Sequence, residues 1–139
     1  MTKEFKDMKG VIAIATTPFN NENLIDFESV DRLSNYYIES KVSGVTILGV
    51  MGEAHKLNIE EQKTLIKRYV NNLINSVPVI VGVSNAGLDN LELLSKFSMD
   101  SGASGVMVSG KNGLKNDDQI KSYFNQVVDR TQDIPICLQ

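Results

Sequence analysis

Five short apolar runs recur along the chain at intervals of about 30 residues, and a stretch with helical periodicity follows each of the first four. The runs are rich in β-branched residues and are nearly continuous in apolar character, which is typical of parallel strands covered on both faces. They are Val11–Ala15, Val45–Leu48, Val77–Val83, Gly105–Val108 and Ile134–Leu138. This series predicts an α/β protein with a parallel sheet and right-handed crossovers.

Four helices are predicted between the runs, over about residues 26–41, from Asn58 onward, over about 88–101, and from near Asn116. Asn58 is followed three positions later by Glu61, which is the pattern of a capping box. The side chains expected to face the core are Phe27, Val30, Leu33, Tyr37 and Ile38; Leu65, Ile66, Tyr69, Val70 and Leu73; Leu91, Leu94, Phe97 and Ser98; and Ile120, Tyr123, Phe124 and Val127.

Two architectures accept this pattern, an open doubly wound sheet and a closed (β/α)8 barrel. In both, ligands bind beyond the C-terminal ends of the strands. The segments expected at this edge are Thr16–Phe19, Gly49–Lys56, Ser84–Gly87, Ser109–Gly113 and whatever follows Gln139.

Composition removes several functional classes. A chain of 139 residues with a net charge of -3 has the length of one domain and no basic surplus for nucleic-acid binding. The charged N-terminus and the absence of a long apolar run predict a soluble cytoplasmic protein without membrane contact. The only cysteine, Cys137, excludes a disulfide framework and is expected in the core. His55, the only histidine, has no acid cluster of ligand spacing beside it, so neither a metal site nor a cofactor is expected.

Nucleotide-binding motifs fail their context tests. Gly105–Asn112 nearly matches a phosphate-binding loop, but its first glycine precedes the strand and Asn112 replaces the magnesium-binding hydroxyl. The first strand is followed by Thr16–Pro18 instead of a glycine-rich dinucleotide fingerprint.

Several motifs, in order and spacing over essentially the whole chain, resemble the dihydrodipicolinate synthase / N-acetylneuraminate lyase family. They are Ala15–Phe19 with Asp26, Gly44–Glu53 with Leu57 and Glu60–Glu61, Pro78–Val83, Gly102–Ala103 and Pro135–Ile136. The resemblance implies a class I aldolase-type TIM barrel of roughly twice this length. It also implies a lysine that forms a Schiff base with pyruvate or another 2-keto acid, followed by C–C bond chemistry or dehydration.

The resemblance assigns substrate binding to Thr17, to Gly49, Val50, Met51, Gly52 and Glu53, and to Gln139. In the family, the turn after the second strand commonly reads G-T-T-G-E and holds the carboxylate of the keto acid. Val50 and Met51 replace both threonines, so backbone N–H groups can persist as donors while both hydroxyls are lost. Glu53 matches the family's acid, and fixing the turn or capping the next helix is as good an account of it as a substrate contact.

Other positions depart from the family's pattern. No tyrosine matches the proline-tyrosine segment that follows the fourth strand, and Gln139 occupies the tyrosine position at the end of the fifth. Glutamine donates a hydrogen bond but does not transfer a proton as a phenol does. This favours some other keto-acid chemistry over the synthase and the sialic-acid lyase activities.

The resemblance implies that the Schiff-base lysine lies on a sixth strand, beyond Gln139; none of the eleven lysines of this chain lies inside an apolar run. Lys56 and Lys111 are expected to be surface charges in loops, and His55 a polar residue leading into the second helix.

The sequence is therefore expected to form a single domain over residues 1–139, the N-terminal part of a TIM barrel with about four βα units plus a fifth strand, from a longer enzyme. The expected function is a 2-keto-acid lyase whose fragment alone is inactive. The alternative is a non-catalytic barrel relative or a half-barrel module that binds a small molecule. The expected partners are the 2-keto acid and further copies of the chain, since the family commonly forms tetramers.

Overall fold

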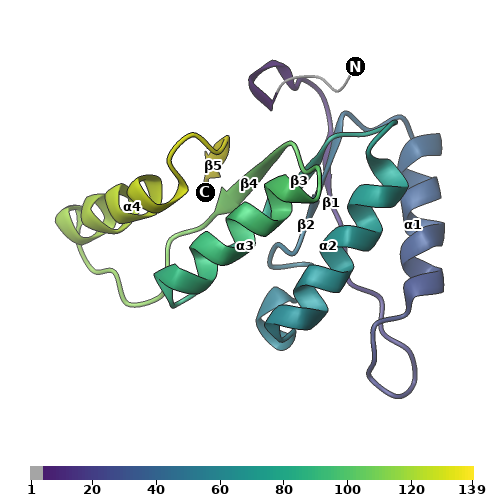
Figure 1. Cartoon of the computed structure of the whole chain (residues 1–139), viewed down its shortest axis with the longest axis horizontal. Helices are drawn as coiled ribbons and strands as arrows, with labels where there is room; N and C mark the ends of the chain where they lie inside the picture. The colour runs from purple at the N-terminus through teal and green to yellow at the C-terminus, as the bar shows by residue number, and fades with distance from the viewer. Residues whose placement is uncertain (1–4) are drawn as a thin grey trace.

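The structure, a computed structural model, describes residues 5–139 and shows a parallel sheet with its strands in sequential order (Figure 1). The strands are β1 (Ile12–Ile14), β2 (Gly44–Ile47), β3 (Val79–Gly82), β4 (Gly105–Val108) and β5 (Ile136–Leu138). The helices are α1 (Phe27–Glu39), α2 (Ile59–Leu73), α3 (Leu88–Asp100) and α4 (Asp117–Thr131), with 3₁₀ turns η1 (Phe5–Asp7) and η2 (Ala54–Lys56). A doubly wound sheet would reverse its strand order. The sequential order therefore selects the incomplete barrel.

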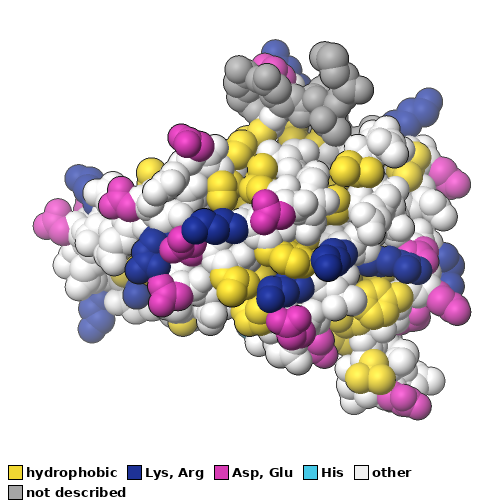
Figure 2. All heavy atoms as spheres, viewed as in Figure 1, with side chains coloured by type: hydrophobic (Ala, Val, Ile, Leu, Met, Phe, Trp, Pro, Cys, Tyr) yellow, Lys and Arg dark blue, Asp and Glu magenta, His cyan; other side chains and the backbone are white. Residues whose placement is uncertain are grey.

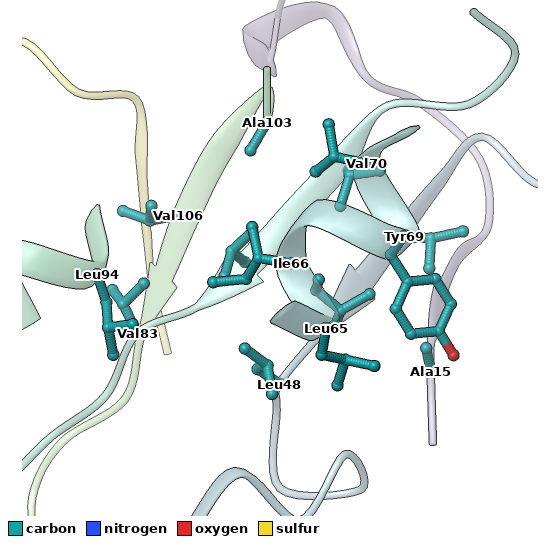
Figure 3. Close-up of a cluster of buried hydrophobic side chains, with 14 of the residues drawn as sticks. Ala15, Leu48, Leu65, Ile66, Tyr69, Val70, Val83, Leu94, Ala103 and Val106 are labelled. Atoms are coloured by element: carbon teal, nitrogen blue, oxygen red, sulfur yellow. The ribbon is translucent and has the colours of Figure 1, made fainter. Parts of the chain in front are cut away.

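The helices cover one face of this sheet, and the hydrophobic core lies between the two layers (Figures 1 and 3). Val45 is paired in register with Val79, so both side chains point toward the helices and are buried. From the helix side, Leu65, Ile66 and Tyr69 of α2 are fully buried against them. The predicted apolar stripe of α2 is thus confirmed in full.

The opposite face of the sheet carries no helix among the described residues. Ile12 and Ile14 of β1 remain 36% and 40% exposed there. Cys137 pairs in register with Met107 and is exposed, so its expected place in the core is wrong. The physical reason is the curvature of a barrel, whose inner face is covered only when further strands close it.

The N-terminal turn η1 lies over the starting ends of the strands on this inner face. A Cβ added to Gly105, at the start of β4, would lie 2.8 Å from Phe5 Cδ2. One added to Gly44, at the start of β2, would lie 3.4 Å from the sulfur of Met8. The inner face is therefore partly closed at the edge opposite the expected ligand site.

Three helices begin at the predicted positions, each with a capping side chain. The Asn58 side chain accepts from the Glu61 N–H at 2.9 Å, and the Glu61 carboxylate accepts from the Asn58 N–H at 2.8 Å, which completes the capping box. Asp26 and Asn116 cap α1 and α4 through the N–H groups of the third residue that follows each.

Two expected core residues lie nearer the surface. Ile120 is 40% exposed because α4 is the last helix of the series, and its flank bearing Ile120 and Val128 has no neighbouring helix among residues 5–139. Phe97 is only partly buried, and the ammonium groups of Lys63 and Lys67 lie 5.6 and 5.3 Å from its ring centroid. Its exposed ring face thus contacts cations instead of core side chains.

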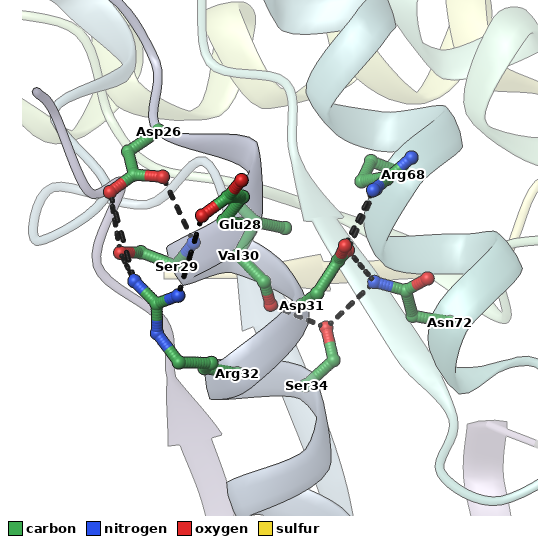
Figure 4. Close-up of polar contacts among 9 residues, drawn as sticks. All are labelled: Asp26, Glu28, Ser29, Val30, Asp31, Arg32, Ser34, Arg68 and Asn72. Atoms are coloured by element: carbon green, nitrogen blue, oxygen red, sulfur yellow. Dashed lines mark hydrogen bonds and ion pairs between the residues drawn. The ribbon is translucent and has the colours of Figure 1, made fainter.

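The outer helical layer is also joined by polar contacts. Asp31 of α1 accepts hydrogen bonds from Arg68 Nε at 2.7 Å and Asn72 Nδ2 at 2.8 Å, both on α2 (Figure 4). These hydrogen bonds, first from Arg68 and then from Asn72, hold the pKa of Asp31 below its usual value. Figure 2 shows acidic and basic side chains interspersed over this helical surface. No helix within residues 5–139 is long and apolar enough to span a bilayer.

Candidate functional site

A small pocket lies where β2, β3, β4 and β5 end. Its volume is about 120 Å³, and it opens on the inner side of the sheet at the C-terminal edge expected for a ligand. The lining residues are Leu48, Gly49, Val50, Ala54, His55, Gly82, Ser84, Met107, Ser109 and Gln139. The structure thus brings Gln139 together with the start of the turn at Gly49, although 90 positions separate them in sequence.

The turn after β2 is held by a close backbone contact. Leu48 adopts a left-handed conformation with φ 55°, which redirects the chain as it leaves the strand. Its carbonyl passes so near β3 that a Cβ added at Gly82 would lie 2.3 Å from Leu48 O. Only glycine fits at residue 82 with the turn in this position.

Two N–H groups of the turn after β2 donate hydrogen bonds to carbonyls of the same turn. The Gly52 N–H donates to Gly49 O at 3.1 Å, and the Glu53 N–H donates to Val50 O at 3.0 Å. The N–H groups of Val50 and Met51 have no acceptor among residues 5–139. Two backbone donors at the tip of the turn are therefore available to a ligand, next to two exposed apolar side chains.

Thr17 lies behind the turn instead of in the pocket. Its buried hydroxyl donates to Gly52 O at 2.6 Å and ties the loop after β1 to the loop after β2. Tyr69 supports the same loop, because its phenol donates to Thr16 O at 3.1 Å. Burial raises the pKa of Tyr69, so the phenol remains protonated and keeps this donor. Both hydroxyls fix the loops after β1 and β2, next to the pocket.

The charged residues near the turn face outward. Glu53 has φ 53°, and its carboxylate pairs with Lys56 Nζ at 3.1 Å. Lys111 lies over the ring of Tyr123, with Nζ 5.6 Å from the centroid, in a separate groove beside α4. His55 is exposed and lines the pocket at its rim. Residues 5–139 contain no cluster of three or more potential metal-ligating side chains.

Two pocket residues, Ser84 and Ser109, begin segments that were expected at this edge but were not assigned to substrate binding. Ser84 follows β3 and Ser109 follows β4 by the same offset from the paired residues Gly82 and Met107. The Ser109 N–H donates to Ser84 Oγ at 2.9 Å, and the two hydroxyl oxygens lie 3.1 Å apart. The available signal was a serine just past the end of two neighbouring parallel strands, since such positions meet at one edge of the sheet.

Gln139 is held in place through its backbone. Its N–H donates to Val108 O at 2.9 Å, and its carbonyl accepts from the Gly110 N–H at 3.3 Å. This extends the pairing of β4 and β5 by one residue and brings Gln139 to the pocket wall. Gln139 thus lines the pocket because the strand pairing continues to the end of β5.

Comparison with known sequences identifies related enzymes. The model of the "Dihydrodipicolinate synthetase family" matches residues 7–138. The chain is 30% identical over 131 residues to the 4-hydroxy-tetrahydrodipicolinate synthase of Methanocaldococcus jannaschii, covering 94% of this chain and 45% of that protein. It is 29% identical over 132 residues to the enzyme of the same name from Methanococcus aeolicus, with the same coverage. The chain thus spans less than half the length of these relatives.

Solved structures agree in fold. Dihydrodipicolinate synthase from Rhodopseudomonas palustris superposes with a TM-score of 0.88 at 42% identity, over 92% of this chain and 42% of that one. YagE from E. coli K12, a prophage protein of the same family solved in complex with pyruvate, gives a TM-score of 0.84 at 27% identity, over 93% and 43%. The parallel sheet and its helices match under half of each of these TIM barrels, as expected for an incomplete barrel. From the match over residues 7–138 we conclude that the chain belongs to the dihydrodipicolinate synthetase family.

Proposed function

We propose that the chain supplies the carboxylate-binding part of a lyase that forms a Schiff base with pyruvate or another 2-keto acid. The observation that carries this proposal is the pocket at the strand ends, where the turn at Gly49 and Val50 meets Ser84, Ser109 and Gln139. Support comes from family membership and from the pyruvate bound by the solved relative YagE.

The size and the charge of the pocket suit a small acid. A water molecule occupies about 30 Å³ of liquid, so 120 Å³ holds about four waters or one molecule of a few heavy atoms. Among residues 5–139, no Asp, Glu, Lys or Arg lines it. A carboxylate placed there would lie beside Val50, whose N–H has no acceptor among these residues, without repulsion from a neighbouring protein carboxylate.

The proposed chemistry needs an amine that this segment does not place in its pocket. Attack of a neutral lysine amine on the keto carbon, followed by protonation and loss of water, forms an iminium ion. The iminium accepts the electron pair of a breaking C–C bond; in the bond-forming direction it loses a proton from the adjacent carbon and becomes an enamine, which donates its electron pair to the second substrate. We place this lysine in the part of the protein that the chain does not cover, on the next strand after Gln139. The isolated segment would then bind the acid without turning it over.

Gln139 separates the proposed reaction from that of the synthases. Its amide can donate a hydrogen bond to a substrate oxygen, but it cannot take and return a proton as a tyrosine can. We therefore propose one of two arrangements: either another group of the protein transfers the proton, or the substrate reacts without proton transfer at the position of Gln139. An aldol-type or dehydration reaction on a keto acid other than the synthase substrate fits this residue.

Borohydride trapping tests the proposal. The protein expressed from the intact gene would be incubated with pyruvate, 2-oxobutyrate or 2-oxoglutarate and sodium borohydride, then digested and analysed by mass spectrometry. A reduced adduct on a lysine beyond Gln139 is expected. The replacement of two threonines by Val50 and Met51 favours one alternative, a non-catalytic module that binds a small molecule. Absence of an adduct with every keto acid would select that alternative.

A further inference from the structure

The serine pair at the ends of β3 and β4 forms a hydrogen-bonded polar part of the pocket wall. Gly82 and Met107 are paired in register, and the Val83 N–H donates to Met107 O at 3.0 Å, so the strands stay in register as far as the serines. The side chains of Ser84 and Ser109 are therefore positioned by the sheet itself and not by a mobile loop tip.

The hydrogen bonds within the pair leave one donor to spare. Ser84 Oγ accepts a hydrogen bond from the Ser109 N–H, and one of the two hydroxyls donates to the other across 3.1 Å. Two hydroxyls carry two protons, so the other O–H has no partner within the pair. Because donation from the backbone polarises the bonds that follow it in the chain, this last hydroxyl is a strengthened donor.

The pair also lies close to the turn that has lost its hydroxyls. Ser84 and Ser109 line the same small pocket as Gly49 and Val50. The side chains of Val50 and Met51 are apolar and cannot donate, whereas both N–H groups at this tip lack an acceptor among residues 5–139. A carboxylate between the turn and the pair would receive donors from both sides.

We infer that the hydroxyl pair of Ser84 and Ser109 binds the carboxylate of the substrate, in the role that side chains of the turn after β2 cannot fill in this protein. The inference rests on the proposed function, because it takes a carboxylic acid to be the ligand of this pocket. It adds the two residues that decide recognition of the acid group. A hydroxyl donating to a carboxylate forms a short, charge-assisted bond, stronger than one between neutral groups.

The test measures binding of pyruvate and of propionate, which has a carboxylate but no keto group, by calorimetry on the full-length protein. Ser84→Ala and Ser109→Ala are expected to raise the Kd for both acids at least about tenfold, the range for loss of a hydrogen bond to a charged group. Ser109→Thr keeps a hydroxyl and should bind within about threefold of the unaltered protein. Ser122→Ala, at an exposed serine on α4 outside this pocket, should leave binding unchanged.

The outcomes separate this inference from the proposed function. Binding of both acids that is equal in the unaltered protein and both alanine variants would overturn the inference and leave the keto-acid proposal standing. Propionate binding that depends on the serines, without a borohydride adduct from any keto acid, would support the inference and overturn the proposed lyase. Absence of binding by both acids would overturn the inference, and borohydride trapping with the other keto acids would then decide the proposed function.

Discussion

Replacement of Gly82 by alanine should strongly destabilise the protein, because the backbone of the functional turn occupies the space that a side chain would need. The added Cβ would lie 2.3 Å from Leu48 O, 2.7 Å from Leu48 C and 3.1 Å from Gly49 N. These are backbone atoms, so the overlap cannot be relieved by a rotamer change. Overpacking costs about 1–3 kcal/mol, and this position lies at the upper end because Leu48 is buried and its turn is held on both sides.

Urea denaturation followed by circular dichroism measures the effect. With a slope of about 1.5 kcal/mol per molar urea, a loss of about 3 kcal/mol lowers the midpoint by about 2 M. Gly110→Ala is the matched control, since a Cβ at Gly110 meets nothing within 4 Å, and it should stay within about 0.5 kcal/mol. Pyruvate binding should weaken in Gly82→Ala as the turn moves. A midpoint within about 0.5 M of the unaltered protein would refute the steric argument.

Three further perturbations follow from individual hydrogen bonds. Thr17→Val leaves the carbonyl of the buried residue Gly52 without its hydrogen-bond donor and should lower the free energy of unfolding by about 1–2 kcal/mol. Thr17→Ser keeps the hydroxyl and should retain most of this stability. Urea titration distinguishes the two variants. The buried hydroxyl of Tyr123 has no hydrogen-bond partner within the described residues, so Tyr123→Phe should leave the stability unchanged or raise it. Tyr69→Phe loses a 3.1 Å hydrogen bond and should lower the free energy of unfolding by about 1 kcal/mol. Equal losses of stability in the thermal melts of the two variants would contradict this. The pKa of Asp31 is lowered in the folded state, so the contribution of this carboxylate to the free energy of unfolding is complete above its unfolded pKa and disappears as pH falls through its folded pKa. Between pH 6 and pH 3, the Asp31→Asn variant should therefore lose less stability than the unaltered protein. Parallel pH profiles of the two proteins would argue against this account.

Most of the fold was accessible from the sequence because the signals for it are local. The capping box at Asn58 was predicted and is present, and the apolar stripe from Leu65 to Leu73 is buried as expected. Element ends were less accurate. Leu48 was expected to close the second strand but adopts a left-handed turn, which depends on the space left by Gly82 on a different strand.

The errors share a physical cause. Cys137 lies in an apolar run and Ile120 lies at helical spacing from Tyr123, Phe124 and Val127, and such patterns predict burial only when some other element covers the side chains. The inner face of an incomplete barrel and the outer flank of α4 have no such cover among the described residues. Local periodicity indicates which apolar side chains lie on the same face of a helix or strand. It does not indicate whether another element of the fold packs against that face.

The sequence predicted where the pocket lies in the fold, but not which side chains contact one another in it. The strand-end rule placed Gly49 and Val50 at the correct edge, the family resemblance added Gln139, and all three line the pocket. It did not reveal that Thr17 lies behind the turn or that Ser84 and Ser109 are hydrogen-bonded to each other. Those facts depend on strand register and on distances of a few tenths of an ångström, which a single sequence does not specify.

The sequential strand order makes the pocket modular. The strands β2, β3, β4 and β5 each contribute pocket residues at or just after their C-terminal ends, and each of β1 to β4 forms a contiguous cassette of about 30 residues with the helix that follows it. Exchange of the β3–α3 cassette with that of a relative would therefore replace Ser84 while leaving the turn at Gly49 on its own cassette. New substrate preferences could in this way be acquired one wall at a time, by recombination at boundaries that leave the other walls intact.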